Sequence, residues 1–134
     1  MNKRIVLITL WLLCIIGMIL HFNYHIGEIF YGIDIIRPDA NGQVPMSVFV
    51  IRTLFYHLPI IWILCIIYFE AKPVKLGLFI LSVLYAFAHA SHLMGEIKNE
   101  SIDPSQLSVL SIVLLIAVIL VIEHYKYWKS QGNN

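Results

Sequence analysis

Charged residues are scarce in this chain: they make up 13% of its 134 residues, whereas hydrophobic residues make up 60%. A water-soluble domain of this size needs more charge to cover so much apolar surface, so we expect lipid to surround most of the exterior. The net charge of +1 leaves no basic excess with which to hold a nucleic acid. The composition therefore indicates an integral membrane protein that contacts the lipid bilayer and has no nucleic-acid partner.

Cysteine is also scarce. Cys14 and Cys65 each stand inside an apolar run, far apart in the chain. This spacing fits neither a CxxC redox motif nor a disulfide framework. We expect both side chains to be buried as small hydrophobic groups.

Four apolar segments are long enough to cross a bilayer, which takes about 20 residues of helix. They cover residues 5–30, 46–69, 76–95 and 107–125. The connections between them contain prolines, which favour turns and helix ends: Pro38, Pro45, Pro73 and Pro104. The sequence thus predicts an all-α, four-helix membrane bundle, formed by one domain over residues 1–134.

Basic residues are distributed unevenly between the two sides of this bundle. The N-terminus, the middle connection and the C-terminus contain Lys3, Arg4, Lys72, Lys75, Lys126 and Lys129. The other two connections contain Arg37 and Lys98, together with Asp34, Asp39, Glu100 and Asp103. Because basic loops stay on the cytoplasmic side, we expect both termini in the cytoplasm and the chain in the plasma (inner) membrane.

Ionisable residues inside two of the spans lie on single helical faces. In the first span His21, His25 and Glu28 are spaced i, i+4, i+7. In the third span a polar seam with heptad spacing consists of Ser82, Tyr85, His89, His92 and Glu96. Such groups are costly in lipid, so they turn inward and mark a site. We expect this site in the outer half of the membrane.

The two polar seams also resemble each other in sequence. "HFNYHIGEI" at residues 21–29 and "HASHLMGEI" at residues 89–97 each contain two histidines followed by Gly-Glu-Ile. Two helical hairpins related as parallel repeats would produce this likeness. A match of three residues in apolar sequence also arises by chance, so duplication and coincidence both stay open.

The other two spans contain fewer polar groups. In the second, Thr53 and His57 share a face at i, i+4, and Pro59 leaves a backbone carbonyl near residues 53–55 without its usual donor. The last span shows only Ser108 and Ser111 in its apolar run. We expect it to pack and to face lipid, with His124 solvated near its cytoplasmic end.

Imidazoles and carboxylates on facing helices are typical ligands of transition metals in helical bundles. The candidate ligands are His21, His25, Glu28, His57, His89, His92 and Glu96, and the candidate groups around them are Arg52, Tyr56 and Tyr85. This mixture of nitrogen and oxygen ligands suits Fe, Zn, Mn or Cu. The sequence therefore predicts metal handling or metal-dependent redox chemistry, the latter making the protein a membrane oxidoreductase.

Three alternatives compete with the metal site. One histidine from each seam could bind a haem with Arg52 at a propionate, although Glu28 and Glu96 would repel propionates. The same histidines could relay protons or pass ions in a cofactor-free transporter or channel. The chain could also be a homo-oligomer or a structural subunit of a larger membrane complex, with histidines that only hydrogen-bond between helices.

Overall fold

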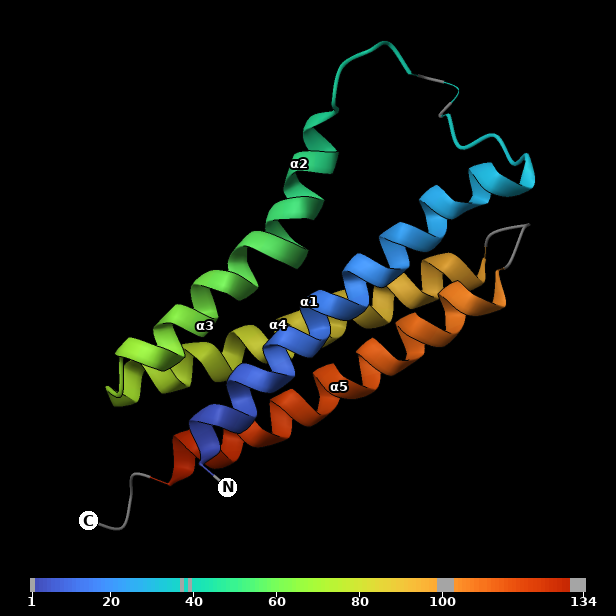
Figure 1. Ribbon diagram of the computed structural model, residues 1–134. Coiled ribbons are helices and arrows are strands. Elements are labelled where there is room, and N and C mark those ends of the chain that lie inside the picture. The colour runs from blue at the N-terminus through green and yellow to red at the C-terminus, as the bar shows by residue number, and fades with distance from the viewer. Residues whose placement is uncertain (1, 37, 39, 99–102, 131–134) are drawn as a thin grey trace.

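The computed structural model describes residues 2–36, 38, 40–98 and 103–130, and these form an all-helical bundle (Figure 1). In chain order the elements are α1 (Lys3–Gly27), η1 (Glu28–Tyr31), α2 (Met46–Arg52), η2 (Thr53–His57), α3 (Leu58–Tyr68), α4 (Lys72–Ile97) and α5 (Pro104–Lys129). The short η1 is a 3₁₀ extension of α1, and α2, η2 and α3 follow one another as the second span. Four helical stretches are long and apolar enough to cross a membrane, which confirms the predicted all-α membrane bundle.

Side chains and prolines define where these helices begin. Asn2 caps α1 by accepting a hydrogen bond from the backbone N–H of Arg4, at 3.0 Å. Asp103 caps α5 in the same way through the N–H of Ser105, at 2.8 Å, and Pro104 occupies the first turn. The last helix therefore begins three residues before the predicted boundary at residue 107. This extension places Gln106 inside the membrane-spanning helix.

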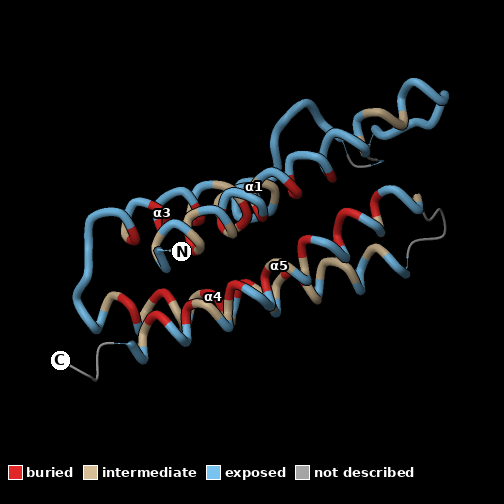
Figure 2. Tube along the Cα trace, turned by 60° about the horizontal axis from the view of Figure 1, so that its bottom comes forward, coloured by how far each residue is buried: buried red, intermediate tan, exposed pale blue. Residues whose placement is uncertain are grey.

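The last helix, α5, is the central packing partner in the bundle. It packs along both α1 and α4, and its buried positions recur along its whole length (Figure 2). The helix α3 packs against α1, whereas α2 diverges from α1 toward the end of the bundle that lies away from the two termini (Figure 1). We call this end the outer end. The expectation that the last span packs is confirmed, but it also contributes buried polar groups that its apolar run did not suggest.

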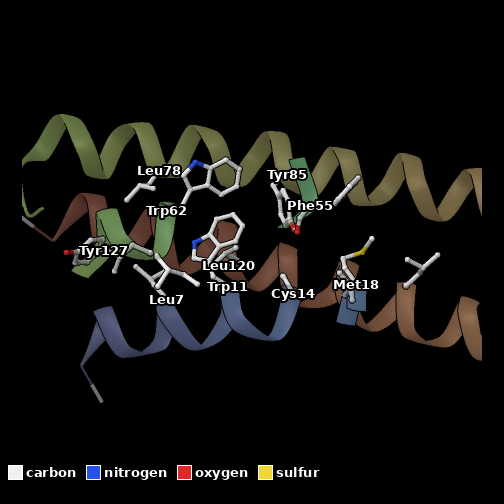
Figure 3. Packing of buried hydrophobic residues seen from close by; sticks show 14 residues of the cluster. Leu7, Trp11, Cys14, Met18, Phe55, Trp62, Leu78, Tyr85, Leu120 and Tyr127 are labelled. Carbon is white, nitrogen blue, oxygen red and sulfur yellow. The ribbon is translucent and has the colours of Figure 1, made fainter. Parts of the chain in front are cut away.

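One such group is His124, which was expected to be solvated and is fully buried. Its Nε2 accepts a hydrogen bond of 3.0 Å from the indole Nε1 of Trp11. Trp11 in turn packs against Trp62 and Tyr85, at ring-centroid distances of 4.8 and 5.0 Å (Figure 3). The prediction for His124 was wrong because it treated the end of the helix as the edge of the core, whereas the N-terminal part of α1 covers that position.

The π-helical segment η2 follows from Pro59. A proline has no N–H, so the carbonyl of Phe55, four residues earlier, loses its helical donor. The phenol of Tyr85 takes that place and donates to the Phe55 oxygen at 3.3 Å. The local widening appears in the bond from the N–H of Leu58 to the carbonyl of Thr53, five residues back. The predicted free carbonyl is confirmed, and its new partner joins the second span to α4.

The N-terminus, the connection between α3 and α4, and the C-terminal end of α5 lie at one end of the bundle (Figure 1). The Arg4 side chain fastens two of them together: its Nε donates to the Ile66 carbonyl at 2.9 Å, and its other nitrogens contact the Ile67 carbonyl and the Glu70 carboxylate. The basic residues that predicted the cytoplasmic side therefore share one end of the molecule. Which compartment this end faces stays a prediction.

Cysteine labelling tests that orientation. In a background that carries Cys14→Ala and Cys65→Ser, the exposed position Gln43 changed to Cys should react with a membrane-impermeant maleimide in intact cells. The exposed Lys72 changed to Cys should react only after permeabilisation, because the positive-inside rule places it in the cytoplasm. The reverse labelling pattern would contradict the predicted orientation. Arg37, Asp39 and Glu100, which entered that prediction, lie outside the described residues.

Candidate metal centre

Helical spacing places two pairs of potential ligands toward the outer end. His21 and His25 are four residues apart in α1, and His92 and Glu96 are four residues apart in α4. Residues at this spacing share one face of a helix. Both helices pack on α5, and the two polar faces meet inside the bundle.

The four side chains approach one another closely. The Nε2 atoms of His21 and His92 are 3.1 Å apart, and Nε2 of His25 lies 3.9 Å from Oε1 of Glu96. Ring centroids are 4.7 Å apart for His21 and His25, and 5.0 Å for His21 and His92, both pairs edge to face. One ligand atom from each of His21, His25 and Glu96 lies within 4.8 Å of the others. We call His21, His25, His92 and Glu96 the His/Glu cluster.

This cluster is only partly shielded from solvent, and the His25 side chain stays 41% exposed. His21 is 4% exposed, and His25, His92 and Glu96 are partly buried. Polar groups that lose water need other partners inside the protein. The Nδ1 of His21 is buried and has no hydrogen-bond partner among the described residues. This nitrogen therefore lacks the partner that a buried polar atom usually has.

A carboxylate and an amide lie on the far side of His25. The Nε2 of Gln106 donates to Oε1 of Glu28 at 2.6 Å and lies 3.2 Å from Nδ1 of His25. That Nδ1 is 3.7 Å from the same Glu28 oxygen. Gln106 is 1% exposed. Glu28, expected as a ligand, thus faces the nitrogen of His25 that points away from Glu96.

Gln106 is the site residue that the sequence reasoning missed. The signal was present: a polar amide two residues after Pro104, within the first turn that a proline favours. The predicted span begins at residue 107, so Gln106 falls just outside it. Its role depends on α5 lying beside α1, which no local pattern specifies.

Two of the expected ligands lie apart from the cluster. His57 is exposed, and its Nδ1 is 3.3 Å from the hydroxyl of Thr53, as expected from their shared helical face. His89 is buried against Tyr85 and Phe55, at centroid distances of 4.4 and 5.0 Å. Neither ring nitrogen of His89 has a partner among the described residues. Phe55 also contacts the His92 ring at 5.8 Å, so it lies between these two histidines.

The three residues expected around the site join or flank the helices. The phenol of Tyr56 donates to the carbonyl of Met18 at 3.2 Å, and that of Tyr85 donates to the carbonyl of Phe55. Arg52 is exposed near the junction of α2 and η2. The two tyrosines therefore connect the second span to α1 and α4, on the side of the cluster that faces the two termini.

A half-open cleft of about 610 Å³ lies at the outer end, between the end of α1 with η1 and the start of α5. Glu28 and Asp103 supply carboxylates to its wall, and Asn23 and Ser105 supply neutral polar groups. Since Glu28 also contacts Gln106, one side chain links the cleft to His25.

No protein-family model, curated protein or solved structure matches this chain.

Proposed function

We propose that this multi-pass membrane protein binds one divalent transition-metal ion through His21, His25 and Glu96, with His92 as a fourth ligand. The observation that carries the proposal is the convergence of ligand atoms from α1 and α4 within 4.8 Å. The bound ion would serve redox chemistry or metal handling near the outer end of the bundle.

The distances suit a small ion after a modest adjustment. Imidazole nitrogen and carboxylate oxygen bind such ions at about 2.0–2.2 Å, so two ligands on one ion are roughly 3–3.5 Å apart. The pair of His21 and His92 lies at 3.1 Å, and the pair of His25 and Glu96 at 3.9 Å. The atoms of the second pair must therefore come closer together when an ion binds.

The ligand types favour iron, zinc or manganese. Two histidines and one carboxylate are the set of non-haem Fe(II) sites and of several catalytic zinc sites. The carboxylate of Glu96 disfavours Cu(I), which prefers soft sulfur ligands. On six-coordinate iron or manganese, four protein ligands leave positions for water or a substrate, which reactivity requires, whereas zinc with all four ligands would form a closed site.

An ion fits this cluster better than a haem. Two axial imidazoles of one haem place their nitrogens about 4 Å apart, twice a bond of about 2 Å, with the macrocycle between the rings. The nitrogens of His21 and His92 are 3.1 Å apart with their rings edge to face. Glu28 and Glu96 would in addition repel the propionates.

Elemental analysis of detergent-purified protein tests the proposal. We expect about one Fe, Zn or Mn per chain, and occupancy at background in the variant that carries His25→Ala and Glu96→Gln. His57→Ala is the matched control, because it removes an exposed imidazole outside the cluster and should retain the ion. Since protons and metals compete for imidazole nitrogen, occupancy should also fall in acidic buffer.

A wild-type protein that stays metal-free after incubation with Fe(II), Zn(II) and Mn(II) would contradict the proposal. Equal occupancy in the wild type and the double variant would do so as well. A Soret band in the visible spectrum would assign the histidines to a haem instead. The hydrogen-bonded pair of His21 and His92 would, in a metal-free protein, favour the cofactor-free proton pathway.

A further inference from the structure

We infer that Glu28 and Gln106 are positioning residues for His25: with a metal ion on Nε2, Glu28 would accept the proton of Nδ1, and Gln106 holds Glu28 in place. The inference rests on the proposed metal site and deepens it. It also changes the predicted role of Glu28 from metal ligand to partner of a ligand.

The two ring nitrogens of His25 face two different carboxylates. Its Nε2 lies 3.9 Å from Glu96, and its Nδ1 lies 3.7 Å from Glu28. Glu96 shares the His/Glu cluster with His21, so Nε2 is the nitrogen on the metal side. An imidazole that binds a metal through one nitrogen carries its proton on the other. With a metal ion on Nε2, Nδ1 would therefore carry a proton, and the Glu28 carboxylate, 3.7 Å away, is the acceptor available to it.

Gln106 fixes the position of that acceptor. Its hydrogen bond to Glu28 is 2.6 Å long, and its own side chain is almost completely buried. Glu28 also lines the outer cleft, where water would otherwise compete for the carboxylate. The capped first turn of α5 holds Gln106 rigidly, because Asp103 and Pro104 define the start of that helix.

The two neighbours of Nδ1 favour opposite tautomers of His25. The Nε2 of Gln106 lies 3.2 Å from Nδ1 of His25, where an amide N–H can donate only to an unprotonated nitrogen. That contact suits the tautomer with its proton on Nε2, which cannot coordinate. A carboxylate accepts hydrogen bonds and cannot donate them. Glu28 lies 3.7 Å from Nδ1, and a small approach would let it accept the Nδ1 proton of the coordinating tautomer, in the manner of the carboxylate–histidine pairs that accompany many metal sites.

Zn(II) affinity, measured by competition with a chromophoric chelator, tests the inference in the full-length protein in detergent. Glu28→Gln and Gln106→Leu should each weaken binding by about 10- to 100-fold, the usual effect of losing such a partner. The variant with both changes should bind no more weakly than Glu28→Gln alone, because Gln106 acts through Glu28. Asp103→Asn is the matched control: it removes a charge from the same cleft and keeps a good helix cap.

Pulsed EPR of the Cu(II)-substituted protein separates a positioning role from a ligand or folding role. Electron spin echo modulation reports the remote nitrogen of each coordinated imidazole and responds to its hydrogen bond. In Glu28→Gln we expect the same number of bound imidazoles and a shifted remote-nitrogen coupling for one of them. Asp103→Asn should leave the spectrum unchanged.

Each other outcome is decisive. Affinities in Glu28→Gln and Gln106→Leu equal to that of Asp103→Asn would overturn the inference and leave the metal site intact. Loss of binding in Glu28→Gln as complete as in His25→Ala, with a changed ligand count, would make Glu28 a direct ligand. A wild-type protein without metal affinity would refute the proposed function, and the inference would fall with it.

Discussion

Replacing Gly17 with alanine is expected to destabilise the bundle by about 1–3 kcal/mol, the usual cost of overpacking a tight contact. A Cβ atom at Gly17 would overlap with Cγ2 of Val113 in α5. Valine is stiff at χ1 and cannot swing that methyl group away freely. The helices α1 and α5 must therefore separate, and small residues at close helix crossings in membranes serve to prevent this separation.

A compensating change makes this prediction specific. The same new Cβ would lie 3.7 Å from Cβ of Val113, an ordinary contact. Val113→Ala should therefore restore most of the stability lost in Gly17→Ala, and the two changes should be strongly non-additive. Gly77→Ala in α4 is the control, because no neighbouring atom lies within 4 Å of its added Cβ. The free energy of unfolding, from SDS titration in mixed micelles, checks each variant.

Metal binding should respond to the same separation of α1 from α5. His21 and His25 lie on α1, one and two turns beyond Gly17, and Gln106 reaches His25 from α5. A wider spacing between these helices should thus lower metal occupancy in Gly17→Ala, with recovery in the double variant. Unchanged stability in Gly17→Ala would mean that α1 and α5 do not approach as closely as described.

Removing the Trp11 side chain should have the largest effect on stability. Trp11 is fully buried, and truncating such a residue to alanine costs about 3–5 kcal/mol. The change would also leave the buried Nε2 of His124 without its donor, an additional penalty of about 1–3 kcal/mol. Trp11→Ala is therefore expected to yield little folded protein.

Trp11→Phe isolates the hydrogen bond from the packing. A phenyl ring keeps much of the contact with Trp62 and Tyr85 but has no N–H, so we expect a loss of about 1–3 kcal/mol. Adding His124→Leu should recover part of that loss, because it removes the unpartnered acceptor. Trp128→Phe is the control, since the Nε1 of Trp128 has no hydrogen-bond partner among the described residues. Thermal unfolding in detergent, followed by circular dichroism, gives the midpoints of the wild type and of these three variants. Equal midpoints for Trp11→Phe and the wild type would contradict the prediction.

Composition and local spacing predicted the features that depend on single helices. Four long apolar runs determine four spans, because a bilayer leaves helices as the only way for such runs to satisfy their backbones. The face shared by Thr53 and His57, and the carbonyl released by Pro59, were also predictable, since helical geometry fixes neighbours at i+4. Both expectations are confirmed by contacts in the second span.

Only the tertiary structure decided which of these polar residues meet. The sequence placed seven candidate ligands on three helices. Which of their ligand atoms come together depends on how each helix is rotated about its axis and on the angles at which the helices cross and diverge. The rotation of α4 brings His92 and Glu96 to His21 and His25, and leaves His89 against Tyr85. The local geometry of η2 leaves His57 exposed. Gln106 and His124 acquire partners on α1 only because α5 packs beside that helix.

The sequence by itself therefore determined that the chain is a four-span membrane protein with histidines and glutamates grouped on single helix faces, because hydropathy and helical period act within one segment. The tertiary structure decided the membership of the His/Glu cluster and gave Glu28 its place behind His25. The physical reason is that coordination and hydrogen bonding require atoms about 2–3.5 Å apart. Such distances between helices are set by close contacts such as that of Gly17 with Val113, and no pattern within a single helix encodes them.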